Sequence, residues 1–139
     1  GKNVSAEQLA AATKLFGSVG RAMQLDEQHM DAVTGLSGSG PAYIYIVIES
    51  LADGGVKMGL PRDAAIQQAA QTVLSQTVLG AAKTVLSTGE HPAKLKDQVT
   101  TPAGVTIDGI MELEEGGLRV TLIKAVVKAT ERARQLLHK

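Results

Sequence analysis

The segment from Thr100 to Thr106 carries the side chains best suited to bind a charged ligand. Its sequence is Thr-Thr-Pro-Ala-Gly-Val-Thr, and Pro102 and Gly104 mark it as a turn before a helix. Three threonine hydroxyls and the free N–H groups of a helix N-terminus would form a nest for a carboxylate. A threonine cap followed by an ordinary turn explains the same residues, and the residues alone favour that plainer interpretation.

A second candidate is the glycine-rich stretch from Gly35 to Pro41, with the sequence Gly-Leu-Ser-Gly-Ser-Gly-Pro. Its spacing differs from the dinucleotide-binding fingerprint, no strand precedes it, and no lysine follows it as in a P-loop. We expect a tight, irregular connection between helices, because three glycines and two serines do not favour a regular element. The N–H groups of the helix opened by Pro41 could still bind an anion.

Other residues with catalytic potential are isolated in the sequence. Ser37 and Ser39 have no clear base nearby, so neither is a strong candidate nucleophile. The histidines lack the spacing of metal ligands, so we predict no metal site; they are His29, His91 and His138. An acidic cluster is expected to be an exposed helix end rather than an acid–base pair; its members are Glu112, Glu114 and Glu115.

The composition indicates one domain with a thin aliphatic core. The chain has 139 residues, of which 44% are hydrophobic and only 2% aromatic. Small aliphatic side chains each bury little area, so such a core often gains stability by sharing surface with a partner chain. The formal net charge is zero, which argues against a nucleic-acid partner. Because the chain has no cysteine, disulfides and thiolate chemistry are excluded.

Neither a membrane span nor a secretory signal is expected. The longest apolar run, Ala42 to Ile48, is far shorter than the ~20 residues that cross a bilayer. The N-terminus shows no signal-peptide pattern. We therefore expect a soluble, cytoplasmic protein that binds neither nucleic acid nor membrane.

Apolar periodicity and helix-end signals predict six or so helices and an all-α fold, a helical bundle. Ser5 is expected to cap a helix to about Phe16, and Asp26 a short helical segment to Thr34. Arg21 to Leu25 could form one short strand. Longer helices are expected over residues 41–58, 61–87, 92–99, about 105–115 and 118–137. The helix from Pro41 is apolar on nearly all sides over its first half, which predicts that it is buried.

Five stretches that succeed one another along nearly the whole chain fit one family pattern. They are Asp31 to Tyr43, Leu51 to Arg62, Gly80 to Lys83, His91 to Pro102 and Glu112 to Arg119. Each motif is weak alone, but the ordered set resembles the C-terminal domain of pyrroline-5-carboxylate reductases.

The resemblance implies an enzyme that reduces 1-pyrroline-5-carboxylate to L-proline with NADPH or NADH, the last step of proline synthesis. In that family a Rossmann domain binds the cofactor, and the helical domain interlocks with a second copy into a homodimer, which often assembles into a decamer. Residues 1–25 resemble only the last helix and strand of the Rossmann domain. Residues 26–139 resemble the helical dimerisation and substrate-pocket domain. We therefore expect the chain alone to bind no cofactor and to be inactive.

The resemblance also implies roles for single residues. Thr34 matches a threonine near the ring nitrogen of the substrate, which makes it a candidate catalytic or positioning residue. Lys96, Asp97 and Gln98 lie where the family approaches the cofactor. Three residues match those that cradle the substrate carboxylate: Thr101, Gly104 and Thr106.

Three features depart from the family pattern. Ala103 replaces a usual glycine, which strains the backbone if the turn needs a positive φ. Gln98 replaces the common Asn or Asp, which weakens the case for a cofactor contact. Residues Gln71 to Leu79 contain a tandem repeat, Gln-Thr-Val-Leu-Ser then Gln-Thr-Val-Leu, that adds five residues. Five added helical residues rotate the remainder of a helix by about 140° and advance it about 7.5 Å.

We expect the repeat to lie in one continuous, longer helix with altered packing, because it contains neither Gly nor Pro. A local bulge and a looped-out segment stay open as alternatives. Two other functions also stay open: a purely structural helical oligomerisation module, and an engineered chain with no ligand site. A chance likeness of a helical adaptor is disfavoured by the order of the motifs. Binding of proline near Thr101 and Thr106 would separate a substrate-pocket domain from a structural module.

Overall fold

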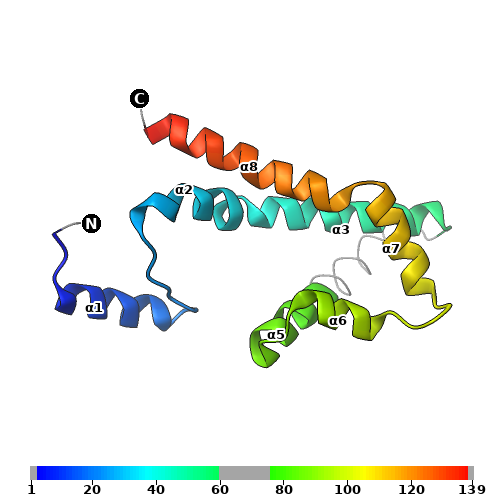
Figure 1. Ribbon diagram of the computed structural model, residues 1–139, viewed down its shortest axis with the longest axis horizontal. Helices are drawn as coiled ribbons and strands as arrows, with labels where there is room; N and C mark the ends of the chain where they lie inside the picture. Colours follow the sequence, from blue (N-terminus) through cyan, green and yellow to red (C-terminus); the bar gives the residue numbers. More distant parts are fainter. Residues whose placement is uncertain (1–2, 60–75, 138–139) are drawn as a thin grey trace.

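The regular elements of the protein are helices, as the computed structural model shows for residues 3–59 and 76–137, the part of the chain it describes (Figure 1). The all-α prediction is confirmed. No helix within these two ranges combines the length and the apolar character needed to cross a membrane. The elements in chain order are α1 (Ala6–Gly17), the 3₁₀ helix η1 (Glu27–His29), α2 (Met30–Val33), the π-helical turn η2 (Thr34–Gly38), α3 (Gly40–Lys57), α5 (Leu79–Thr88), α6 (Pro92–Val99), α7 (Val105–Glu115) and α8 (Leu118–Leu137).

Local capping chemistry sets several helix ends, and the predicted cap at Ser5 is confirmed. The Ser5 hydroxyl accepts a hydrogen bond from the Gln8 amide at 3.2 Å, and the Gln8 side chain accepts one from the Ser5 amide at 2.9 Å. Gly89 ends α5 and Gly117 separates α7 from α8, both with positive φ. Asp26 occupies the N-cap position of η1, but its side chain makes no capping hydrogen bond.

The predicted strand from Arg21 to Leu25 is wrong, because these residues have no regular structure. A strand is stabilised by hydrogen bonds to a neighbouring strand, and the described residues contain none. Residues 60–75, where the helix opened by Pro61 was predicted to begin and where most of the repeat falls, lie outside the described residues. Residues 76–78 are π-helical and lead into α5, whose end at Thr88 agrees with the prediction.

The stretch from Gly35 to Pro41 is helical, so the prediction of an irregular loop there is wrong. Pro41 has no N–H group, and in an α-helix its ring clashes with the carbonyl four residues earlier, that of Ser37. The chain widens into η2 immediately before Pro41, and the Ser39 amide donates to the Thr34 carbonyl, five residues back, at 3.2 Å. The widened turn lets one helical path run from α2 into α3 through the proline.

Helix α8 lies against α2 and η2, and a glycine makes this approach close (Figure 1). Gly35 is buried at the crossing. A Cβ atom on Gly35 would stand 2.5 Å from Thr130 Oγ1, 2.9 Å from the Thr130 nitrogen and 3.0 Å from the Val126 carbonyl oxygen. Arg134 on α8 also faces Asp31 on α2, with 3.7 Å between Nε and Oδ2. The two segments therefore pack backbone against backbone.

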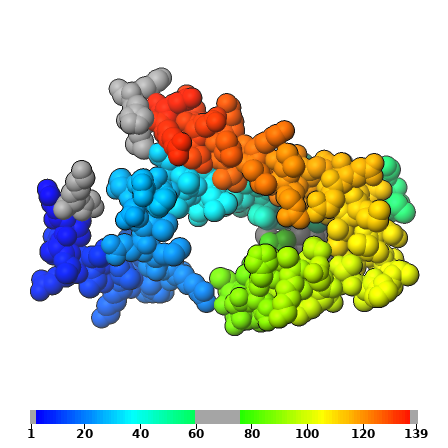
Figure 2. All heavy atoms as spheres, in the orientation of Figure 1, coloured from blue at the N-terminus to red at the C-terminus, as the bar shows by residue number. Residues whose placement is uncertain are grey.

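The apolar first half of α3 is largely exposed in the single chain, which contradicts its predicted burial. Tyr45 and Ile46 are 63% and 62% exposed. Among the described residues, Ala52 is the one buried hydrophobic side chain. The physical reason is that α8 covers one side of this path only, and Figure 2 shows an opening between the start of α3 and α5. Residues 3–59 and 76–137 thus supply apolar faces without a second layer of their own to cover them.

We predict that Gly35→Ala destabilises the protein by about 1–3 kcal/mol, because the new methyl group meets the backbone of α8, which cannot move aside. The measurement is urea unfolding at one fixed protein concentration. Gly38→Ala in the same turn is the matched control, since its Cβ would meet only Thr34 Cγ2, at 3.8 Å. Equal losses of unfolding free energy in the two variants would contradict this account of the crossing.

Candidate functional site

The segment between α6 and α7 forms a β-turn, as the sequence predicted. Pro102 and Ala103 are its central residues, and the Gly104 amide donates to the Thr101 carbonyl at 3.1 Å. Ala103 has φ = +56°, which is the conformation that a type II turn requires at its third position. The sequence left open whether this position needs a positive φ; the turn does need one, and an alanine here is strained where a glycine would not be.

Gly104 leaves little room for a side chain in this turn. A Cβ atom there would collide with the Thr101 hydroxyl and stand 3.1 Å from the Thr101 carbonyl oxygen. Gly104 is also the N-cap residue of α7, where it offers no side chain to cap the first amides. Those amides and the helix dipole favour an anion at this end of α7. Thr106, half-buried in the first turn of α7, and Thr101, exposed before it, add two hydroxyl groups.

Thr34 begins η2 and is exposed. Its hydroxyl donates to the Met30 carbonyl at 2.9 Å, one turn back. Because that bond uses the only hydroxyl hydrogen, the Oγ1 lone pairs remain to accept a hydrogen bond from a ligand. The Thr34 hydroxyl oxygen is therefore available as a hydrogen-bond acceptor for a ligand. Within one chain it lies well apart from the α6–α7 turn, which stands at the far end of the molecule (Figure 1).

Gln98 is exposed on α6 and lines a groove of about 390 Å³ between α5 and α6. Most of the groove wall is apolar or aliphatic, contributed by Ala81, Val85, Pro92, Leu95 and Val99 among others. Nearby Lys96 pairs with Asp97, with 2.7 Å between Nζ and Oδ1. A cofactor contact by Gln98 stays a prediction.

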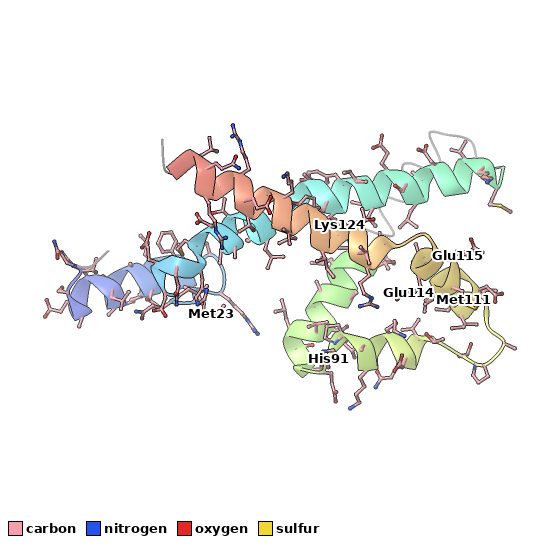
Figure 3. All side chains as sticks on the ribbon, turned by 45° about the horizontal axis from the view of Figure 1, so that its top comes forward. Met23, His91, Met111, Glu114, Glu115 and Lys124 are labelled. Atoms are coloured by element: carbon pink, nitrogen blue, oxygen red, sulfur yellow. The ribbon has the colours of Figure 1, made fainter. Side chains whose placement is uncertain are left out.

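The histidines and carboxylates of the described chain do not gather into a group that could hold a metal ion. His91 instead caps α6, because its Nδ1 atom accepts from the Ala93 amide at 3.2 Å. Figure 3 shows His91 where α6 begins and Glu114 and Glu115 at the C-terminal end of α7. Arg119 pairs with Glu114 at 2.8 Å. The hydrogen bond from Arg119, and then its positive charge, lower the pKa of Glu114 below 4.5.

The Tyr43 side chain makes contacts that the sequence did not predict. Its part-buried hydroxyl lies 3.3 Å from the Gly35 carbonyl oxygen and 3.4 Å from that of Ala125 on α8. The one available signal was a phenol hydroxyl inside an apolar run, since a buried tyrosine usually finds a hydrogen-bond partner. Which partner it finds depends on the fold.

Comparison with known proteins decides the family. Residues 27–136 match the family described as pyrroline-5-carboxylate reductase dimerisation. The chain belongs to this family. The predicted resemblance is thus confirmed.

Similar proteins in this family are named pyrroline-5-carboxylate reductases. The pyrroline-5-carboxylate reductases of Methanosarcina acetivorans and Arabidopsis thaliana are 54% and 55% identical to the chain over 136 residues, 98% of its length. A solved reductase from Coxiella burnetii has a TM-score of 0.85 at 35% identity, covering 98% of this chain and 49% of that one. A Plasmodium falciparum pyrroline carboxylate reductase with NADP bound has a TM-score of 0.81 at 34% identity, covering 97% and 52%. The chain spans about half the length of these reductases.

We predict that Ala103→Gly stabilises this family member by up to about 1 kcal/mol. A non-glycine residue with positive φ costs about 1–2 kcal/mol, and the greater freedom of glycine in the unfolded chain offsets part of the gain. Urea unfolding at fixed concentration measures the change. Ala82→Gly inside α5 is the control and should destabilise by about 0.5–1 kcal/mol. A lower free energy of unfolding in both variants would show that Ala103 is unstrained.

We predict that Arg119→Gln raises the titration midpoint of Glu114 toward its ordinary value. A lowered carboxyl pKa means that the Arg119–Glu114 pair stabilises the fold above the unfolded-state pKa and loses this effect as pH falls through the lowered value. The measurement is the pH dependence of the Glu114 side-chain carboxyl ¹³C shift. Arg132→Gln, at the other end of α8, should leave the Glu114 midpoint in place; a shift there instead would contradict the assignment to Arg119.

Proposed function

We propose that the chain is the dimerisation and substrate-pocket part of a cytoplasmic, NAD(P)H-dependent reductase that converts 1-pyrroline-5-carboxylate to L-proline in proline biosynthesis. The family match over residues 27–136 carries this proposal. Identity above 50% across nearly the whole chain to reductases of an archaeon and a plant supports it.

The exposed apolar faces support a homodimer in which the helices of two copies interlock. Ile46, Leu51 and Ile123 are 62%, 52% and 57% exposed. A groove of about 330 Å³ between α3, α7 and α8 is lined almost wholly by apolar groups, among them Val47, Leu118 and Leu122. Soluble chains rarely leave contiguous apolar surface of this kind uncovered. A second copy would complete the core, and dimers would assemble further into the proposed decamer.

The turn before α7 supplies the proposed carboxylate site. Thr101, Gly104 and Thr106 lie within six residues, around a helix N-terminus that has no side-chain cap. Backbone amides of the first turn of α7 and the two threonine hydroxyls would hold the substrate carboxylate.

Thr34 is the candidate catalytic residue because its hydroxyl oxygen can accept from the substrate's ring nitrogen. The hydroxyl hydrogen is bonded to Met30, so Thr34 would hold the N–H group of the protonated iminium. A protonated C=N group is the better hydride acceptor, so this contact would favour reduction. Since Thr34 and the α6–α7 turn lie apart in one chain, we place the complete site where two copies meet the cofactor-binding domain.

The proposed cofactor of the full-length enzyme is NADPH or NADH. The described residues contain no strand–turn–helix unit of the kind that binds a dinucleotide, which supports a cofactor site in another part of the full-length enzyme. We therefore expect the chain alone to bind no cofactor and to catalyse no turnover of pyrroline-5-carboxylate.

Titration of the ¹⁵N-labelled chain with L-proline, the reaction product, tests the proposed pocket. We predict weak binding that shifts the amides of Thr101, Gly104 and Thr106, and a roughly tenfold loss of affinity in Thr106→Val, which removes a hydroxyl bonded to a charged group. Thr13→Val on α1 is the matched control and should bind proline like the parent chain.

Light scattering of the same sample should give the mass of a dimer or a larger closed assembly. A dimer that shows no proline shifts would support the alternative, a structural oligomerisation module without a ligand site. A folded monomer would overturn the dimer proposal, and turnover with NADPH by the chain alone would overturn its predicted inactivity.

A further inference from the structure

Tyr43 links the π-turn to helix α8. Its hydroxyl stands between two carbonyl oxygens, 3.3 Å from that of Gly35 and 3.4 Å from that of Ala125. Gly35 belongs to η2 and Ala125 to α8, so one side chain from α3 contacts both segments at their crossing. The hydroxyl has a single hydrogen, which the two carbonyls share or receive in turn.

The peptide that Tyr43 contacts is already confined on its other side. Gly35 is buried against the Thr130 nitrogen and the Val126 carbonyl, with no room for a Cβ atom. The Thr130 hydroxyl donates to the same Val126 carbonyl at 2.8 Å. The Gly35 peptide is thus held by α8 on one face and by the Tyr43 hydroxyl at its oxygen.

Thr34 immediately precedes this peptide, and its carbonyl accepts the Ser39 amide in the bond that defines the π-turn. π-Turns are uncommon and have to be stabilised by their surroundings. A contact that fixes the carbonyl of Gly35 therefore also fixes the backbone that carries the Thr34 side chain.

We propose that Tyr43 is a positioning residue: its hydroxyl holds the π-turn in the geometry that presents the lone pairs of Thr34 to the ring nitrogen of the ligand. The ligand part of this inference rests on the proposed function. Tyr43 acts through the backbone of Gly35 and does not itself contact the ligand.

The test compares Tyr43→Phe with Tyr45→Phe in the 139-residue chain. Both variants lose one phenol hydroxyl from α3, and Tyr45 is 63% exposed, so it serves as the matched control. In Tyr43→Phe the Ser39 amide should exchange with solvent about fivefold faster, which is the effect of losing one typical hydrogen bond. The side-chain rotamer couplings of Thr34 should also change, while the mass of the assembly stays the same. Tyr45→Phe should change neither readout.

The outcomes separate positioning from general stabilisation. Faster exchange confined to η2, together with altered Thr34 couplings, supports the proposal. Unchanged exchange at Ser39, or equally faster exchange at amides throughout α3 and α8, overturns it, because the hydroxyl would then have no effect or only a global one.

A proline titration of the same variants tests the ligand part. About threefold weaker binding by Tyr43→Phe than by Tyr45→Phe is expected, since removing one hydrogen bond costs roughly this much. Equal affinities, beside a disturbed π-turn, overturn the link between Tyr43 and the ligand. If the parent chain binds no proline, the proposed function fails, and the exchange and coupling data still decide whether Tyr43 positions Thr34.

Discussion

The close approach of Gly35 to the backbone of α8 is the constraint on which the rest of the structure depends. Because Gly35 has no Cβ, the Thr130 nitrogen and the Val126 carbonyl oxygen can lie within 3.0 Å of the point that a Cβ would occupy. At this separation the two segments have little freedom to slide or rotate. The direction of α3, which follows η2, is set here, and so is the position of Thr34, the residue before Gly35. The pair between Arg134 and Asp31 adds a more distant restraint.

Features that depend on neighbouring residues could be predicted from the sequence. Ser5 and Gln8 form their capping box within four residues, and Gly117 ends a helix by its own backbone freedom. The turn before α7 was predictable for the same reason. In each case the partners of the interaction lie next to one another in the chain.

Features that depend on distant partners were predicted wrongly or missed. The glycine-rich stretch was expected to be irregular, yet contact with α8 and the demands of Pro41 turn it into a π-helical continuation of α2. The strand at Arg21 to Leu25 needs a neighbouring strand that the described residues do not supply. The prediction that α3 is buried within the chain was wrong. An apolar helix face indicates that the face is buried, but it does not show whether the same chain or a partner chain buries it. Tyr43 was missed because one of its partners, Ala125, is 82 residues away.

The two halves of the candidate site lie on parts of the chain that differ in how closely they are packed. Thr34 adjoins the close contact between Gly35 and α8, whereas the turn from Thr101 to Thr106 follows an eight-residue helix, α6, in which every residue except Leu95 is exposed. A ligand that bridges both would find one half preorganised and would lose conformational entropy in ordering the other. A partner chain that packs against α6 would therefore order the carboxylate side of the proposed site, while the crossing at Gly35 holds the Thr34 side in place.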